Sequence, residues 1–263
     1  MYIDGSLMAD YLVIGVAVLI IASFIAGYID AIAGGAGLIL VPACLLVGMP
    51  PQLALGQEKL VSTIGTVAAI KNFIKAKSII WSIVPIGIIS ALLGAFLGAK
   101  AILMFPSHVI EYIIFALLPI GLVATLFKGK VINKSQSQTI KKSALAVFIT
   151  CLLVGFYDGF FGPGTGSIFI IALFLLNSLP LLQASATSKI FNFSSNIGAF
   201  VAFALAGKMA LLVGIPMILA NLLGNHLGSR QAIVSNGAII QKVLMITVFL
   251  MMATLVYRLM MNG

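Results

Sequence analysis

The chain is short of charged residues, of cysteine and of histidine. Asp, Glu, Lys and Arg make up 8% of its 263 residues, against about 25% in an average soluble domain. Two cysteines and two histidines are too few to predict a disulfide framework or a Cys/His metal cluster. Cys44 and Cys151 fall within apolar segments, so we expect two buried thiols. A Walker loop and a Ser–His–Asp set are both missing, so the sequence predicts no enzyme, no cofactor and no bound metal.

Apolar residues fill most of the chain instead. Hydrophobic residues make up 62% of the sequence, and the mean hydropathy is +1.22. The apolar runs are too long and too unalternating for a β-barrel, so we predict an all-α polytopic membrane protein. The acidic N-terminus, with Asp4 and Asp10, argues against a cleaved signal peptide. The net charge of +9 comes largely from lysines in short loops, which orient a membrane protein. No nucleic-acid partner is predicted.

The apolar runs divide the chain into two halves. A helix needs about 20 apolar residues to cross a bilayer. The full-length segments are Tyr11–Ala33, Gln52–Phe73, Ile79–Met104 and Ser107–Phe127, then Ser143–Phe161, Leu181–Ala206, Ala210–Val234 and Ala238–Leu259. Two segments, Leu38–Gly48 and Ser167–Leu176, have only about half that length. We therefore predict a first membrane repeat over 1–127, a cytoplasmic linker over 128–142 and a second membrane repeat over 143–263.

One pattern occurs in both halves. The segment 27–37, GYIDAIAGGAG, returns 128 positions later as GFYDGFFGPGTG at 155–166. Lys59 and Lys189 follow 130 positions apart, and so do the glycine pairs Gly94/Gly98 and Gly224/Gly228. A spacing that slips by only two positions along a whole half indicates two homologous halves. Glycine-broken helices at matching positions of two halves are typical of the binding site of a secondary transporter.

The two halves are predicted to be inverted relative to each other. Each has about five helical segments, an odd number, so the second half enters the bilayer from the opposite side. With the lysine-rich linker in the cytoplasm, the turn around Lys75 and Lys77 is also cytoplasmic. Both termini then lie outside, as the positive-inside tendency favours. The short segments are open to two interpretations, re-entrant or crossing.

The glycines that break the first helix of each half are predicted to bind the substrate. Glycine lets the chain turn sharply and lets a ligand approach the backbone. The helix that follows presents free N–H groups and the positive end of its dipole, which together form an anion site. For the pairs Gly94/Gly98 and Gly224/Gly228, close helix packing is the favoured interpretation. The predicted binding residues at the breaks are Gly34, Gly35, Gly37, Gly162, Gly164, Thr165 and Gly166.

Lys59 and Lys189 lie about two turns into membrane helices, among polar neighbours. Inward lysines offer positive charge to an oxyanion, while an ion pair with Asp30 or Asp158 is the competing interpretation. The two interpretations are compatible if an aspartate orients the lysine while no substrate is bound. A polar stripe shares a helix face with Lys189, although hydrogen bonds between helices also explain such a stripe. The predicted binding residues in these two helices are Gln57, Lys59, Thr187, Ser188, Lys189, Asn192 and Asn196.

Three acidic residues, Asp30, Asp158 and Glu58, are assigned to coupling or to orienting the site. Each aspartate is a proton carrier, a lysine partner or an acceptor for N–H groups freed at the break, and the last two are favoured. Glu58 corresponds to Ser188 in the second half, so it is either a coupling residue or a local difference. The three carboxylates outnumber the two lysines, which keeps H⁺ or Na⁺ coupling open.

The two glycine motifs, together with QEKL at 57–60 and ATSKIFNFSSN at 186–196, resemble the TauE/SafE family of sulfite and organosulfonate exporters. The resemblance extends over nearly the whole chain. It implies a bacterial inner-membrane permease for small sulfur oxyanions such as sulfite or a sulfonate. Much of the family has Gly-Thr where this chain has Gln57-Glu58-Lys59 and Thr187-Ser188-Lys189. The chain thus resembles a lysine-containing subgroup, and the resemblance supports an anion more strongly than it supports sulfite.

We therefore predict a secondary transporter that moves small sulfonate- or sulfite-like anions by alternating access. The anion is held at helix N-termini beside the glycine breaks and by the two lysines. The predicted partners are a small anionic substrate, the lipid bilayer and H⁺ or Na⁺, and the small-residue helix faces are open to two interpretations, packing within the chain or a homodimer. Two alternatives remain: a non-transporting membrane scaffold or assembly protein, and a cation-coupled transporter of another small solute.

Overall fold

The structure, a computed structural model, describes residues 6–132 and 143–234, and every regular element in these residues is helical. The prediction of an all-α protein is thus confirmed. The predicted last span, Ala238–Leu259, lies outside the described residues. In chain order the elements are α1 (Leu7–Asp10), α2 (Leu12–Ala33), α3 (Gly37–Leu46), α4 (Pro51–Lys75), the 3₁₀ turn η1 (Trp81–Ile83), α5 (Val84–Leu103), α6 (Ser107–Ile132), α7 (Ala144–Phe160), α8 (Thr165–Leu176), α9 (Leu181–Leu205) and α10 (Leu211–Val234).

Several helices are suited to a bilayer. Within the described ranges, three are both long and apolar enough to cross a membrane: Leu12–Ile32, Trp81–Leu103 and Leu211–Val234. α4 and α9, with 25 residues each, are as long but carry the polar residues of the predicted site. The outer faces of α2, α5, α7 and α10 expose large apolar side chains, among them Ile21, Leu93, Leu153 and Leu219. Contiguous apolar surface of this kind is typical of contact with lipid.

The helix boundaries follow the glycine and proline signals of the sequence. α2 ends at Ala33 because Gly34 has a φ of 75°, a left-handed conformation that residues with a Cβ disfavour. Gly162 and Gly164, with φ of 95° and 85°, make the corresponding break between α7 and α8. Pro51 is the first residue of α4 and Pro180 directly precedes α9, positions where the missing N–H removes no helical hydrogen bond.

α6 differs from its predicted length. It continues to Ile132, whereas the sequence predicts a polar linker from Lys128 onward. Lysine has a good helix propensity, and a cation near the C-terminal end of a helix complements the helix dipole. A lysine-rich segment therefore does not by itself end a helix. Residues 133–142 of the predicted linker lie outside the described residues.

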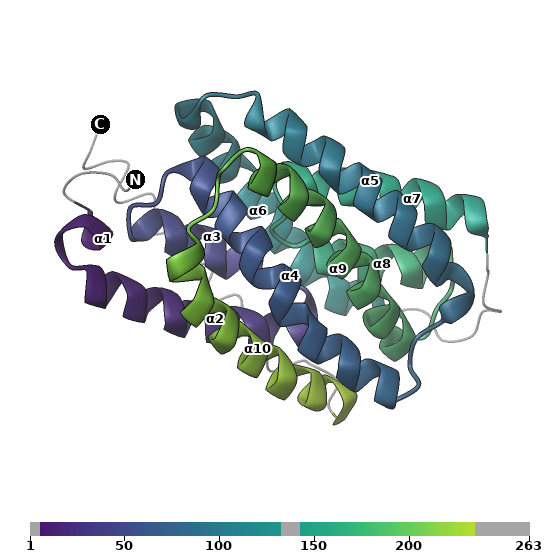
Figure 1. The fold of residues 1–263 in the computed structure, drawn as a ribbon. Helices are drawn as coiled ribbons and strands as arrows, with labels where there is room; N and C mark the ends of the chain where they lie inside the picture. Colours follow the sequence, from purple (N-terminus) through teal and green to yellow (C-terminus); the bar gives the residue numbers. More distant parts are fainter. Residues whose placement is uncertain (1–5, 133–142, 235–263) are drawn as a thin grey trace.

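The long helices form two groups of three. α10 packs against α2 and α4, and we call these three helices the α2 group. α5 packs against α7 and α9, and these three form the α5 group. Figure 1 shows α2 and α10 along one side of the molecule and α5 and α7 along the opposite side, with α4 and α9 in contact between them. Each group combines two helices of one predicted half with one helix of the other half, so the halves interlock.

Glycines let the helices within each group pack backbone against backbone. A Cβ on Gly94 of α5 would lie 2.2 Å from the carbonyl oxygen of Leu152 in α7. At the corresponding position, a Cβ on Gly224 of α10 would lie 2.1 Å from the carbonyl oxygen of Phe24 in α2. Both contacts require glycine, because a real Cβ does not approach a backbone oxygen so closely. These glycines have the packing role that the sequence favours for them.

The two short helices begin in buried surroundings. α3 contacts α2 and α4, while α8 contacts α7 and α9. Every residue of α3 from Gly37 to Leu45 is buried. The first turns of α3 and α8 therefore begin inside the protein, directly after the breaks that end α2 and α7. This arrangement brings two helix N-termini to the interface between the α2 and α5 groups.

Candidate functional site

A small cavity lies between the α2 and α5 groups, at the N-terminal ends of α3 and α8. The volume open to the centre of a water molecule is about 10 Å³, roughly what one water molecule needs. Both glycine breaks and the polar stripe of α9 meet here, so residues that the sequence predicts as one site lie together. The lining residues are Asp30, Gly34, Ala36, Gly37, Glu58, Ser62, Asp158, Gly162, Gly164, Thr165, Gly166, Asn192 and Asn196.

The two glycine breaks touch each other. A Cβ on Gly34 would lie 2.5 Å from the carbonyl carbon of Gly166, and the backbone N–H of Ser167 donates to the carbonyl oxygen of Gly34 over 3.2 Å. Gly37 packs in the same way against Pro163, with its absent Cβ 3.1 Å from the proline Cα. Only glycine permits two broken backbones to approach this closely. The first turns of α3 and α8 therefore face one common space.

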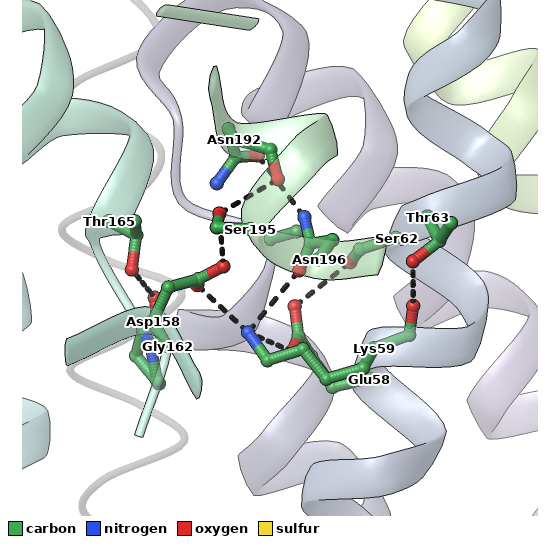
Figure 2. Close-up of polar contacts among 12 residues, drawn as sticks. Glu58, Lys59, Ser62, Thr63, Asp158, Gly162, Thr165, Asn192, Ser195 and Asn196 are labelled. Carbon is green, nitrogen blue, oxygen red and sulfur yellow. Dashed lines mark hydrogen bonds and ion pairs between the residues drawn. The ribbon is translucent and has the colours of Figure 1, made fainter. Parts of the chain in front are cut away.

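Lys59 of α4 is held by acceptors from three helices (Figure 2). Its Nζ donates to Asp158 Oδ1 of α7 over 2.8 Å and to Asn196 Oδ1 of α9 over 3.3 Å. Glu58 Oε2 lies 3.0 Å from the same Nζ. The ammonium group also fills the space beside the second break, where a Cβ on Gly162 would lie 2.5 Å from Nζ. Lys59 is 1% exposed, so its charge depends on these partners.

Lys189 of α9 repeats this arrangement in the other direction. Its Nζ lies 2.9 Å from Asp30 Oδ2 of α2 and also donates to the backbone carbonyl of Asp30. The lysine of each half therefore pairs with the aspartate of the other half. The structure contains the ion pairs of Lys59 and Lys189 with the two aspartates that the sequence left open. Breaking such a buried pair from one side costs about 3–5 kcal/mol, because the remaining charge stays buried.

The two aspartates have further donors. Asp30 Oδ1 accepts from the backbone N–H of Ala36 over 3.4 Å, beyond the break, as the sequence favours. Asp158 Oδ2 accepts from the hydroxyl of Ser195 over 2.6 Å (Figure 2). Each carboxylate is thus fixed by its lysine and by at least one other group. Hydrogen bonds to a charged group of this kind are stronger than those between neutral groups.

Glu58 is a third carboxylate in the same cavity. Its Oε1 accepts from the hydroxyl of Ser62, one turn later on α4, over 2.9 Å. Its counterpart in the second half, Ser188, carries no charge and donates to the carbonyl of Ser185 over 2.8 Å. The site is therefore symmetric in its two aspartate–lysine pairs and asymmetric in Glu58.

Two predicted binding residues point elsewhere. Gln57 Oε1 accepts from the backbone N–H of Ala210 over 3.0 Å, just before α10 begins. Thr187 Oγ1 accepts from the backbone N–H of Ile80 over 3.1 Å, just before η1 and α5. Ile80 and Ala210 are 130 positions apart, like Gln57 and Thr187. Each of the two side chains thus binds the backbone just before a helix of the other half. Neither residue lines the cavity.

The remaining predictions divide between the cavity rim and its surroundings. Gly35, Lys59, Ser188 and Lys189 are not among the lining residues, and the carbonyl of Gly35 accepts from the N–H of Leu38 in the turn before α3. Ser62 and Ala36 line the cavity although the predicted binding residues do not include them. The signal for Ser62 was its spacing, since a residue four positions after Glu58 shares its helix face. Spacing also indicates Ser195, because a residue three positions after Asn192 shares its helix face.

Comparison with known proteins places the chain in a family. Residues 19–255 match the family model described as "Sulfite exporter TauE/SafE". A "Probable membrane transporter protein" of Haemophilus influenzae is 37% identical over 246 residues, which cover 92% of this chain and 94% of that protein. A protein of Sinorhizobium, "Probable membrane transporter protein ORF9", is 38% identical over 88% of each chain. The Escherichia coli "Probable membrane transporter protein YfcA" is 33% identical, over 95% of this chain and 92% of that one.

No solved structure matches the chain, so the family rests on sequence. The match extends from α2 beyond the end of α10 and includes both glycine breaks, both lysines and all three carboxylates of the cavity. The alignments with relatives more than 30% identical cover nearly the whole length of both proteins. The chain therefore belongs to the TauE/SafE family.

Proposed function

We propose that this protein is a secondary transporter that moves small sulfur-containing oxyanions, such as sulfite or a sulfonate, by alternating access. The observation that carries the proposal is the exchange of ion pairs between halves, Lys59 with Asp158 and Lys189 with Asp30, beside two helix N-termini. The description of the matching family model, a sulfite exporter, and the names of the relatives support the same function.

The chemistry of the cavity suits an oxyanion. A sulfonate or sulfite presents three acceptor oxygens, and the groups around the cavity include many donors. The first turns of α3 and α8 supply backbone N–H groups and the positive ends of two helix dipoles. The amides of Asn192 and Asn196 line the cavity, Lys59 donates to Asn196, and Lys189 pairs with Asp30, another lining residue. We infer that the anion replaces an aspartate as the partner of a lysine.

The size of the cavity supports a moving mechanism. Space for about one water molecule does not admit a sulfonate, so the anion enters only when the surrounding helices separate. The lining residues belong to both helix groups, and the two ion pairs cross the interface between them. Rocking of the α2 group against the α5 group would open this interface on one membrane side at a time. The described conformation is then a closed form.

The proposal includes two inverted repeats. Corresponding helices make corresponding contacts: α5 with α7 and α10 with α2, α5 with α9 and α10 with α4. In an inverted pair, the same rocking motion opens the site to opposite sides with equivalent contacts. Both termini then lie outside, and the two short helices begin near the midplane.

The first test is thermal stabilisation of the purified protein by anions. The panel contains sulfite, sulfate, thiosulfate, sulfoacetate, taurine, methanesulfonate, acetate and malonate. A ligand at 100 times its Kd stabilises a protein by about 2.7 kcal/mol, which gives a measurable shift of Tm. We expect one or more sulfur oxyanions to raise Tm while the matched carboxylates do not.

Two variants connect such a shift to the cavity. The double variant Lys189→Met with Asp30→Asn removes one ion pair without changing the net charge and should abolish the shift. The single variant Lys75→Met, at the exposed C-terminal end of α4, should keep it. A shift that survives loss of the ion pair places the anion elsewhere. If sodium stabilises the protein and no anion does, the anion assignment is wrong, and if no solute stabilises it, the scaffold alternative gains.

A further inference from the structure

Three carboxylates line the cavity, and the two lysines that pair with two of them lie outside its lining. The chain has only six acidic residues, and three of them, Asp30, Glu58 and Asp158, line this cavity. All three are buried, with exposures of 4%, 3% and 1%, and so are Lys59 at 1% and Lys189 at 0%. The formal charge of the side chains is therefore −1 when every group is ionised. An uncompensated buried charge is costly in a membrane protein.

The two helix N-termini balance this charge in the empty protein. Each contributes about +0.5 of an elementary charge, and those of α3 and α8 begin at Gly37 and Thr165, both at the cavity. The sum over the two lysines, three carboxylates and two helix ends is then close to zero. A monovalent anion entering this balanced space adds an uncompensated negative charge. One proton restores the balance.

Glu58 is the carboxylate best placed to accept that proton. Asp30 and Asp158 each have a hydrogen-bonded lysine and a second donor. Glu58 shares Lys59 with Asp158, and within the described residues its Oε2 makes no hydrogen bond even though Nζ lies 3.0 Å away. Adjacent residues of a helix do not face each other, so this ion pair has poor geometry. Among residues 6–132 and 143–234, only the hydroxyl of Ser62 donates a hydrogen bond to the carboxylate of Glu58.

Other titratable groups around Glu58 are few. Its own helix contributes Lys59, α7 contributes Asp158, and α2 contributes Asp30, which Lys189 of α9 neutralises. α3 contributes Cys44, a buried thiol. The α9 face at the cavity presents the neutral amides Asn192 and Asn196. Glu58 is thus the carboxylate of the cavity without a lysine of its own.

We propose that Glu58 takes up one proton when the anion binds, so that the anion and a proton occupy the cavity together. The inference rests on the proposed anion transport and specifies its coupling. With Glu58 ionised, an added anion has no positive charge to balance it, and with Glu58 protonated, the side chain becomes neutral and can donate a hydrogen bond. Binding of either ligand therefore favours binding of the other by the same factor. Ser188, at the corresponding position, cannot duplicate this role, so one proton accompanies one anion.

Proton uptake is measured by calorimetry with the full-length protein. The ligand is the anion of the panel that stabilises the protein most. Where several anions stabilise it, methanesulfonate is used, because it has no titratable group near neutral pH. Binding heats in buffers of different ionisation enthalpy give the number of protons taken up. We expect about one proton per anion in the wild type and none in Glu58→Gln. The wild-type Kd should rise about tenfold per pH unit once the empty protein has lost the Glu58 proton, whereas the Kd of Glu58→Gln should not depend on pH.

A second measurement needs no ligand. In infrared spectra recorded during acidification, the carbonyl band of a protonated carboxylic acid is separate from that of a carboxylate. A band in the wild type should be missing in Glu58→Gln and present in Glu111→Gln, which removes the only other glutamate of the chain. Thermal melts of both variants show that the protein remains folded. Absence of a band assignable to Glu58 overturns the inference.

The outcomes separate the inference from the function. If an anion binds without proton uptake, or if Glu58→Gln takes up as many protons as the wild type, anion transport stands and Glu58 is not the coupling residue. Uptake that survives in Glu58→Gln would point to Asp30 or Asp158. If no anion binds, the proposed function fails and the coupling to an anion fails with it, while the infrared band decides whether Glu58 is a proton site at all.

Discussion

Asp158 binds Lys59 at 2.8 Å, and this ion pair joins α7 of the α5 group to α4 of the α2 group. The corresponding pair of Lys189 and Asp30, at 2.9 Å, joins α9 of the α5 group to α2 of the α2 group. Both ion pairs cross the interface that contains the cavity. Any motion that opens this interface must therefore break or exchange both pairs. This makes them the contacts most sensitive to the conformational state of the protein.

The first prediction concerns the stability that these pairs confer. Lys189→Met alone should lower the free energy of unfolding by about 3–5 kcal/mol, because it leaves Asp30 buried without its partner. Adding Asp30→Asn should recover most of this loss, since no buried charge then remains. We choose Lys189 because it pairs with Asp30, whereas Lys59 lies beside both Asp158 and Glu58, so its removal would affect two carboxylates. Unfolding in detergent micelles, analysed as a double-mutant cycle, measures the coupling. Strictly additive effects would show that the ion pair contributes no stability.

The second prediction concerns the first glycine break. Gly34→Ala places a Cβ at a φ of 75° and 2.5 Å from the backbone of Gly166, so one of the two broken segments must move. Gly207→Ala is the matched control, because Gly207 has a φ of 65° but a Cβ there would have no described atom within 4 Å. The control should cost about 1–2 kcal/mol from backbone strain alone, and Gly34→Ala clearly more. Thermal melts compare the two variants. Equal destabilisation would mean that the contact between the breaks is not tight.

The breaks themselves could be predicted because their cause is local. A Gly-Gly or Gly-Pro-Gly cluster inside an apolar run cannot continue a helix, and the structure ends α2 and α7 within a residue of the predicted ends. Repetition of the pattern also indicated that both breaks belong to one site. The polar stripe of Asn192 and Asn196 followed from helical periodicity alone.

The exchange of partners between halves could not be predicted in the same way. Spacing along the chain says that a lysine and an aspartate exist in each half, but not whether each pair forms within a half or between halves. That choice depends on how α4 and α9 pack against each other. Gln57 and Thr187 show the same limit, because a polar residue beside a lysine on a helix faces a different direction. Their partners, Ala210 and Ile80, lie in the other half.

The third prediction separates helix capping from substrate binding at Thr187. Thr187→Val keeps the shape of the side chain but removes the acceptor for the N–H of Ile80. It should lower stability by about 1 kcal/mol, like the loss of a helix N-cap. Because Thr187 does not line the cavity, the anion Kd should stay within about twofold, under half a kcal/mol. Anion titration of the folded variant tests this. A loss of affinity beyond tenfold would restore Thr187 to the substrate site that the sequence predicts.

The fourth prediction concerns the inverted arrangement of the halves, and the chain offers a matched pair of positions for it. Ala76 directly follows α4 and Ala206 directly follows α9, and both are exposed. In an inverted arrangement with a cytoplasmic linker, the turn at Ala76 is cytoplasmic and the turn at Ala206 faces outward. A cysteine is introduced at one of these positions at a time. The native Cys44 and Cys151 can stay in place, because they are buried thiols that should not react with the reagent.

A membrane-impermeant thiol reagent added to intact cells should label Ala206→Cys at once. Ala76→Cys should react only after the membrane is permeabilised, because its turn lies on the other side. Labelling of both positions from outside, or of neither, would mean that equivalent turns lie on one side. The halves would then be parallel, and a rocking motion would not present the two ion pairs to opposite sides of the membrane in equivalent ways.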